Sequence, residues 1–394
     1  MRGRRLLAVA VLLVAVNLRT AVISVGPVLD ELTAGVGLGP GGAGLLTTLP
    51  VLSFALLGSL TPRLARRHGE RRVLCGALLL MTAGLVTRVL VHAAGPFLLL
   101  TVLALTCGAT GNVLLPVLVK RHFPDRIGLL TAGYTAALAV GTAASAAVTV
   151  PLASLRGGVD WRLGLGVWAL PAAVGAAVWL GPAWRDRPVP TADRPARPAV
   201  HRSRTAWALA LFFGSQSMQA YISFGWFALF FREQAGASPT RAGLLIAVLA
   251  VVAVPVSAVV PTVAARFPDQ RPVLAVLMAC YLAAYGGMLL APRSGALVWM
   301  LLAGVAGGTF PLALTMISLR TRAAETTASL SAFVQSVGYV VAGFGPVLVG
   351  VLHGASGGWG WPFALLFADL VLMGVSGWYA GQPRLVEDDL RTRV

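Results

Sequence analysis

The chain has 394 residues, of which 57% are hydrophobic and only 11% are charged. Soluble domains carry about a quarter charged residues, so this composition excludes an ordinary soluble enzyme. The net charge of +17 would suggest a nucleic-acid partner in a soluble protein, but here the basic residues lie between long apolar segments. The three cysteines (Cys75, Cys107 and Cys280) lie inside apolar runs without a CxxC spacing, so we expect no metal, no cofactor and no disulfide framework.

Twelve apolar segments are each long enough to cross a bilayer, whose hydrocarbon core of about 30 Å needs about 20 residues of helix. Their Gly and Pro residues are compatible with membrane helices. We therefore predict an all-α membrane protein. The predicted spans are residues 6–28, 42–61, 73–93, 96–118, 127–150, 162–181, 205–231, 240–261, 273–291, 296–318, 328–352 and 360–380.

The start of the first span, three arginines followed by an apolar run, also fits a secretory signal peptide. The run continues past Asn17 and Arg19, however, and eleven more spans follow. We therefore interpret this segment as the first span.

Arg19 lies about 13 residues into this span, near the bilayer centre. A charge there costs about 2.5 to 3.5 kcal/mol on insertion scales and is usually functional. The first eleven spans contain no Asp or Glu that would neutralise it. Its planar donor fork suits a small carboxylate-like, cyanate or nitro group, which makes Arg19 the leading substrate-binding candidate. Hydrogen bonding to backbone carbonyls is the structural alternative.

Asn17 is a second candidate on the same span. At 100° per residue the two side chains point about 200° apart, so they cannot both face one cavity directly. Bending near Gly26 and Pro27, or the reach of Arg19, would reconcile them. The sequence leaves open which face is inward.

The loop after the second span, Pro62 to Arg72, resembles the G-x-L-A-D-R-x-G-R-R loop motif of the major facilitator superfamily. Pro62 replaces the motif glycine and Arg66 replaces its aspartate. In that superfamily the aspartate takes part in contacts that latch the cytoplasmic side, so this departure puts that latch in doubt. Arg67 and Arg72 remain gating or structural candidates, and a solvated basic loop explains them equally well.

The resemblance implies that the first, fourth, seventh and tenth helices line a central cavity, flanked by the second, fifth, eighth and eleventh. Asn112 on the fourth and Tyr134 on the fifth are therefore substrate-binding candidates, with helix packing as the alternative. Arg88 lies in the outer part of the third helix, which is usually peripheral. We expect a structural or outer-gate role for Arg88, with direct substrate binding as the less favoured alternative.

A polar stretch between the sixth and seventh spans predicts a cytoplasmic linker at 185–204 between an N-terminal half (1–184) and a C-terminal half (205–394). An offset of 199 residues aligns the sequence AGLL at 43–46 with AGLL at 242–245. The same offset pairs two arginines of the first half with two of the second, which adds two gating candidates: Arg67 with Arg266 and Arg72 with Arg271. This repeat predicts two six-helix halves related by pseudo-twofold symmetry.

The seventh span carries a polar stripe, which indicates a cavity wall or, alternatively, hydrogen bonds between helices. Its substrate-binding candidates are Gln216, Gln219 and Trp226. On the eleventh span Gln335 and Tyr339 lie one turn apart and are candidates of the same kind. Asp369 in the twelfth span is the one embedded carboxylate of the sequence. A proton relay there is less favoured, because the twelfth helix normally lies far from the cavity.

The basic residues predict the orientation. With the N-terminus inside, 24 of the 31 basic residues fall on the inner side and five on the outer side. The positive-inside rule then places both termini in the cytoplasm. The basic residues on the inner side make up most of the positive charge, and they face the anionic inner leaflet of the membrane. We therefore expect a lipid partner and no nucleic acid.

Several short motifs resemble the cyanate and nitroimidazole transporter family (CynX/NimT type) of the major facilitator superfamily. They are Asn17-Leu18-Arg19, the sequence AGLLTTLP at 43–50, the sequence GNVLLP at 111–116, and QSVGY at 335–339. The resemblance spans nearly the whole chain. It implies a small anionic or weakly acidic substrate.

We therefore expect a monomeric secondary transporter of the cytoplasmic membrane that moves a small anion or weak acid by alternating access, with a coupling proton left open. The alternative is a proton-driven multidrug or toxic-compound exporter, although the fifth helix has no Gly-x-x-x-Gly-Pro run. An intramembrane enzyme is disfavoured because the spans contain no HExxH and no paired Asp. A channel is disfavoured by the twofold repeat.

Overall fold

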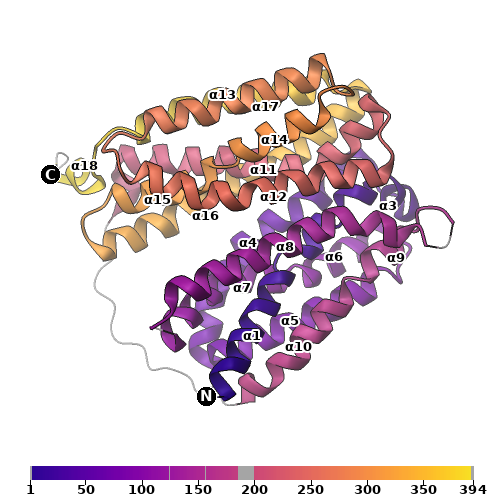
Figure 1. The fold of residues 1–394 in the computed structure, drawn as a ribbon, viewed down its shortest axis with the longest axis horizontal. Coiled ribbons are helices and arrows are strands. Elements are labelled where there is room, and N and C mark those ends of the chain that lie inside the picture. Colours follow the sequence, from indigo (N-terminus) through magenta and orange to yellow (C-terminus); the bar gives the residue numbers. More distant parts are fainter. Residues whose placement is uncertain (1, 124, 156, 185–198, 392–394) are drawn as a thin grey trace. The chain divides into compact units, whose positions relative to one another are not determined.

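The computed structural model describes residues 2–123, 125–155, 157–184 and 199–391 (Figure 1). Within these ranges all regular secondary structure is helical, which confirms the predicted all-α class. The helices up to residue 184 are α1 (Arg2–Asn17), α2 (Thr20–Ile23), η1 (Gly26–Val28), α3 (Leu29–Val36), α4 (Pro40–His68), α5 (Glu70–Arg88), α6 (Ala94–Ala104), α7 (Thr106–His122), α8 (Ile127–Ala153), α9 (Trp161–Gly166) and α10 (Ala169–Trp184).

The remaining helices begin after the predicted linker, whose residues 185–198 lie outside the described residues. They are η2 (Val200–Arg202), α11 (Arg204–Ala235), α12 (Pro239–Ala264), α13 (Arg271–Leu290), α14 (Ala296–Ala306), α15 (Thr309–Leu319), α16 (Ala324–Ser356), α17 (Gly360–Ala380) and α18 (Val386–Arg391).

Ten helical runs of the described chain are long and apolar enough to cross a membrane. The two other predicted spans correspond to α5, which carries charged residues at both ends, and to α11, which carries the polar stripe. The structure is therefore consistent with twelve spans.

Four predicted spans are each built from consecutive shorter helices. The first, predicted at 6–28, contains α1, α2 and η1 and continues directly into α3, and the others are α6 with α7, α9 with α10, and α14 with α15. Apolar composition predicts where a span lies but not where its helix is interrupted. The interruption of the first span falls at the leading candidate residue, Arg19.

The described chain divides into two compact units. The first consists of Met1–Ala192 with Phe224–Glu233 and Ala237–Ala247, and the second of Asp193–Ser223, Gln234–Gly236 and Val248–Val394. α11 contributes to both: its segment Phe224–Glu233 belongs to the first unit and the rest of the helix belongs to the second.

In the first unit, α5 packs against α10, α6 and α7, and α1 packs against α8, α10 and α7. The buried face of α1 is made of small apolar side chains, including Ala10, Val11 and Val14, which are fully buried. Small residues allow helix backbones to approach closely, which is the usual basis of helix association in membranes.

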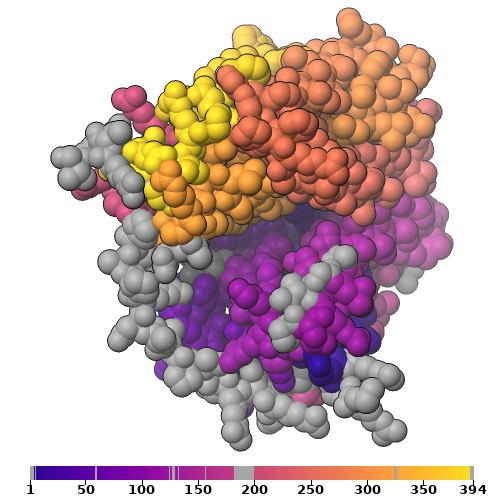
Figure 2. All heavy atoms as spheres, turned by 60° about the vertical axis from the view of Figure 1, so that its left-hand side comes forward, coloured from indigo at the N-terminus to yellow at the C-terminus, as the bar shows by residue number. Residues whose placement is uncertain are grey.

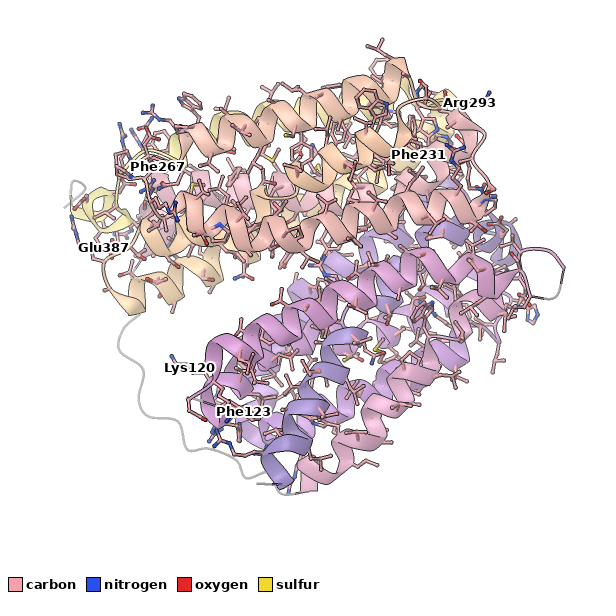
Figure 3. The ribbon with its side chains drawn as sticks, viewed as in Figure 1. Lys120, Phe123, Phe231, Phe267, Arg293 and Glu387 are labelled. Carbon is pink, nitrogen blue, oxygen red and sulfur yellow. The ribbon has the colours of Figure 1, made fainter. Side chains whose placement is uncertain are left out.

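In the second unit, α13 packs against α14 and α17, and α13 and α17 run side by side (Figure 1). Phe267 and Glu387 lie at one end of this unit and Arg293 lies at the opposite end (Figure 3). This alternation places consecutive connections at opposite ends of the helices, as membrane spans require.

Large apolar side chains lie exposed along the helices, among them Leu290 (89% exposed), Val375 (68%) and Leu99 (69%). Such exposure would be a liability in water. It suits helices that face lipid, whose backbone polar groups are satisfied within each helix.

Candidate substrate-binding site

Arg19 lies at the interruption of the first span. α1 ends at Asn17, and Arg19 has a non-helical backbone (φ −123°, ψ −2°) before α2 begins at Thr20. The carbonyl of Arg19 accepts hydrogen bonds from the amides of Val22 and Ile23, at 3.1 and 2.9 Å, so the chain resumes its helix directly. The break changes the direction of the arginine side chain relative to α1.

Two glycines of neighbouring helices hold this break in place. A Cβ added at Gly141 of α8 would overlap the carbonyl oxygen of Val16, and one at Gly108 of α7 would lie 2.5 Å from the carbonyl oxygen of Leu18. Any side chain at these positions would push α7 or α8 away from the chain just before Arg19. The glycines therefore fix the position of Arg19.

The guanidinium of Arg19 has no protein partner in the part of the chain that the structure describes. The residue is half-buried, and its Nε is fully buried without a hydrogen bond. An embedded cation without a counter-ion is costly, and its free N–H groups can donate to an anion.

Asn17 takes a different direction and makes protein contacts. Its Nδ2 donates to the carbonyl oxygen of Leu13 at 2.8 Å and to that of Pro171 in α10 at 3.1 Å, and the residue is buried. The amide therefore ties α1 to α10. Because α1 ends at Asn17 and Arg19 is non-helical, the regular spacing of 100° per residue does not hold between these two side chains.

Asn112 and Tyr134 lie on the two helices that clasp the break. Asn112 on α7 is exposed and follows Gly111, where an added Cβ would overlap Leu18. Tyr134 on α8 is half-buried and lies two turns before Gly141, on the same helix face. Asn112 is thus exposed, whereas Tyr134 is only partly exposed.

Arg88 at the end of α5 is fully buried, and none of its three side-chain nitrogens has a hydrogen-bond partner in the described residues. The next residue, Val89, accepts a hydrogen bond from Arg162 Nε at 3.1 Å, and the guanidinium of Arg162 lies over the ring of Trp161. The bond from Arg162 ties the end of α5, next to Arg88, to the start of the sixth span.

The last turns of α11, within the first unit, form an ion pair that the sequence alone did not reveal. Arg232 binds Glu31 of α3 through two hydrogen bonds of 2.8 and 3.1 Å, and the Asp30 carboxylate lies 3.4 Å from the same guanidinium. Trp226, one of the predicted binding residues, is buried and donates through Nε1 to Thr47 of α4 at 3.2 Å. These contacts join α11 to α3 and α4.

In the second unit, Gln219 is the centre of a buried polar cluster. Its Nε2 donates to Asp369 of α17 at 2.8 Å and its Oε1 accepts from Tyr285 of α13 at 2.8 Å. Asp369 of the twelfth span is thus hydrogen-bonded to the polar stripe of the seventh span. Gln216 is buried and donates instead to the carbonyl oxygen of Phe213 and to Ser217.

The eleventh-span candidates lie on α16 and are half-buried. Gln335 donates to Ser331 at 2.8 Å, and Tyr339 packs edge-to-face against Phe213 with 5.3 Å between ring centres.

The loop arginines predicted as gating residues have two environments. Arg67, Arg72 and Arg266 are exposed. Arg271 binds Asp269 and lies over the ring of Trp378 at 5.3 Å. The guanidinium of Arg271 donates to Asp269 and holds the pKa of that carboxyl below its ordinary value.

Arg320 is a structural residue that sequence reasoning missed, because it was counted only as a cytoplasmic positive charge. It is buried and donates to the carbonyl oxygens of Ala380 and Gly381, at 2.9 and 2.8 Å, and to Gln270. Burial lowers the pKa of Arg320 from its ordinary value. The residue fastens the end of α17 to the start of α13.

The acidic helix α18 is held by contacts with the start of α11 and with Arg322. Asp389 accepts from the Ser203 hydroxyl and from the Thr205 amide, at 2.7 and 2.9 Å, and Asp388 pairs with Arg322. In Figure 2 yellow atoms of the C-terminal segment lie against orange atoms of the same unit. Asp389 therefore caps the start of α11.

The membrane-spanning helical runs, the match to a transporter family and the transporter-named relatives show a membrane transporter rather than an enzyme. The chain belongs to the major facilitator superfamily, whose family model matches residues 7–343. The predicted fold class is confirmed by this match, and the chain is a multi-pass membrane protein with the major facilitator fold.

Two relatives from Escherichia coli K12 cover most of the chain. The 2-nitroimidazole transporter is 35% identical over 97% of both chains, and the cyanate transport protein CynX is 29% identical over 90% of this chain and 92% of its own. The resemblance to transporters of this type is thereby confirmed. A bacterial homologue of the human lysosomal transporter Spinster, in an inward-facing unoccupied conformation, has the same fold, with a TM-score of 0.78, 17% identity and 98% coverage of both chains.

Proposed function

We propose that this protein is a secondary transporter that moves a small anion or weak acid across the cytoplasmic membrane by alternating access. The observation that carries the proposal is the half-buried Arg19, whose guanidinium has no protein partner in the described residues. A substrate carrying negative charge or strong acceptor oxygens would supply the missing partner.

The surroundings of Arg19 support this assignment. Gly108 and Gly141 fix the backbone before Arg19, and the same two helices carry Asn112, which is exposed, and Tyr134, which is half-buried. An amide and a phenol can donate to the same anion without adding charge. We assign Arg19 as the anchor and these two residues as additional donors.

The printed names of the relatives support the substrate class. One relative is a 2-nitroimidazole transporter and another a cyanate transport protein. Nitro and cyanate groups are small, planar and rich in acceptor atoms, so a guanidinium fork matches both. We propose either compound, or a close chemical analogue, as substrate.

The positive-inside bias supports an orientation with both termini in the cytoplasm. The Glu31–Arg232 pair and the Trp226–Thr47 hydrogen bond would then lie towards the outer side of the membrane. In an alternating-access cycle these contacts would close the outer side and break when it opens. We propose that the protein works as a monomer.

Counterflow into proteoliposomes tests the function. Liposomes that contain the purified protein and unlabelled cyanate or 2-nitroimidazole should take up the labelled compound saturably, whereas protein-free liposomes should not. Absence of saturable flux with both compounds would overturn the substrate assignment. If the protein instead protected cells against many hydrophobic compounds, it would be an exporter of the alternative class.

A further inference from the structure

Asp369 is a buried carboxyl group in the middle of a predicted membrane span. It lies near the centre of α17 (Gly360–Ala380) and is 7% exposed. Its Oδ2 accepts a hydrogen bond from Gln219 Nε2 at 2.8 Å, and its Oδ1 is buried and has no hydrogen-bond partner among the residues that the structure describes. Ser215, one turn before Gln219, lies close to this carboxyl, but its hydroxyl is outside hydrogen-bonding geometry.

The Gln219 amide is held by three helices. Its Nε2 donates to Asp369 and, at 3.1 Å, to the carbonyl oxygen of Leu366, and its Oε1 accepts from Tyr285. Both N–H groups and one acceptor lone pair are therefore used, which fixes the orientation of the amide. The cluster links α11 to α13 and α17.

The ionisable side chains on the helices packed against α17 belong to α11, α13 and α16. Those described are Arg204, Tyr221, Arg232 and Glu233 on α11, Arg271, Cys280, Tyr281 and Tyr285 on α13, and Tyr339 and His353 on α16. The charged residues of α11 and α13 lie at the helix ends, about 20 Å along the axis from the cluster. His353 lies in the last turn of α16, against Trp359.

Within the described residues no ion pair involves Asp369, and its hydrogen bond comes from a neutral amide. An ionised carboxylate buried without a cation costs several kcal/mol. The neutral acid avoids this cost, and the free Oδ1 is an atom that can carry the proton. The arrangement suits a carboxyl group that is neutral in this state and ionises when it becomes hydrated.

We propose that Asp369, positioned by Gln219 and Tyr285, is a proton-binding site that couples proton movement to substrate transport. The carboxylate takes a proton from water on one side of the membrane and releases it to water on the other, and no other bond is made or broken. The role in coupling rests on the proposed transport function. Rearrangement of α11 relative to α17 would break the hydrogen bond from Gln219 and expose the carboxyl group.

Coupling to a proton meets a physical need of anion import. Moving one negative charge inward against the membrane potential costs about 2.3 kcal/mol per 100 mV. A proton that moves with a monovalent anion makes the step electrically neutral. A buried acid and an unpaired embedded arginine would together carry this neutral pair.

The test compares Asp369→Asn, Asp369→Glu and the wild-type protein in proteoliposomes, with labelled cyanate and 2-nitroimidazole as probes. Ser376→Ala is the matched control, because Ser376 is a buried polar residue of α17 whose hydroxyl bonds only to carbonyls of its own helix. Counterflow requires no net proton movement, whereas accumulation driven by an inward proton gradient does.

We expect Asp369→Asn to retain counterflow within about twofold and to lose gradient-driven accumulation about tenfold or more. Asp369→Glu should retain part of the coupling, and Ser376→Ala should behave as the wild-type protein. Gradient-driven accumulation by Asp369→Asn at the wild-type level would overturn the proposal.

A second measurement remains informative if Asp369→Asn does not fold or if neither probe is transported. Dicyclohexylcarbodiimide modifies protonated carboxyl groups in apolar surroundings, and mass spectrometry of the wild-type protein locates the modified residue. We expect pH-dependent modification of Asp369 and none of the exposed Asp388. Failure to modify Asp369 at any pH would overturn the proton site independently of the substrate assignment.

Discussion

The arginines of this protein show how differently one side chain can be used in an apolar chain. Arg320 is buried but donates to carbonyl oxygens and to an amide, so its burial is compensated. Arg19 and Arg88 have buried nitrogens without such partners. We expect an arginine with several hydrogen-bond acceptors to stabilise the fold. An arginine in a span that lacks such acceptors among the described residues can instead donate to a bound substrate.

Replacing Arg320 with lysine should destabilise the protein. A lysine cannot reach the same set of acceptors with a planar fork, and buried carbonyls would lose a charged donor, at about 2 to 3 kcal/mol. We expect the thermal unfolding midpoint in detergent to fall by about 5 °C or more. The exposed Arg266→Lys is the control. Equal midpoints for the two variants would show that the Arg320 contacts contribute little.

Individual candidate residues could be identified from the sequence where a single position is unusual for its surroundings. Arg19 and Asp369 stand out because a charge in an apolar run is conspicuous. The bonds from Gln219 to Asp369 and Tyr285 join positions far apart in the chain, so one sequence could not reveal them. Arg320 was missed because the positive-inside rule already accounted for its charge.

At the scale of elements, span positions follow from apolar composition, but interruptions and end contacts follow from tertiary packing. The break at Arg19 depends on Gly108 and Gly141 of two other helices. The pairing of Glu31 with Arg232 likewise needs the three-dimensional fold.

Reversing either charge of the Glu31–Arg232 pair should loosen the contact between α3 and α11. We expect Glu31→Arg and Arg232→Glu each to raise maleimide labelling of Thr47→Cys from outside, in a background lacking the three native cysteines. Losing an ion pair that contributes about 1 kcal/mol to the closed contact should increase the labelling about fivefold. The double reversal should return labelling to the parent level. Unchanged labelling in both single variants would show that the pair is not a gate.

Removing the Asp389 cap of α11 should have a pH-dependent effect. Burial alone would raise the pKa of Asp389, but hydrogen bonds from Ser203 and Thr205 outweigh it and hold the pKa below its ordinary value. Asp389 therefore stabilises the fold at pH values above its ordinary pKa. This stabilisation is lost as the pH falls through the folded-state pKa.

We expect Asp389→Ala to cost about 1 kcal/mol at neutral pH, the usual cost of a lost N-cap. The difference between the thermal unfolding midpoints of the variant and the wild type should reach its maximum above about pH 5. It should become smaller below about pH 4. The exposed Asp388→Ala provides the comparison. A difference that stays constant from pH 7 to pH 3 would contradict the role of the ionised carboxylate.

For the whole molecule, composition was sufficient to predict a polytopic helical protein, and the family match confirms its fold class. Ten helical runs meet the length and composition of a span, and α5 and α11 account for the remaining two. Charge position predicts the orientation, because the net charge is distributed unevenly over alternate connections. The division of α11 between the two units depends on packing that hydropathy does not encode.

The central claim is that Arg19 is the anchor for an anionic or acceptor-rich substrate. Equilibrium binding of labelled cyanate and 2-nitroimidazole to purified wild-type protein, Arg19→Lys and Arg19→Ala tests it most directly. We expect saturable binding of at least one compound by the wild type, weaker binding by Arg19→Lys, and at least about 30-fold weaker binding by Arg19→Ala, since losing one partner of a desolvated charge pair costs about 2 kcal/mol or more. Wild-type affinity in a well-folded Arg19→Ala variant would contradict the account.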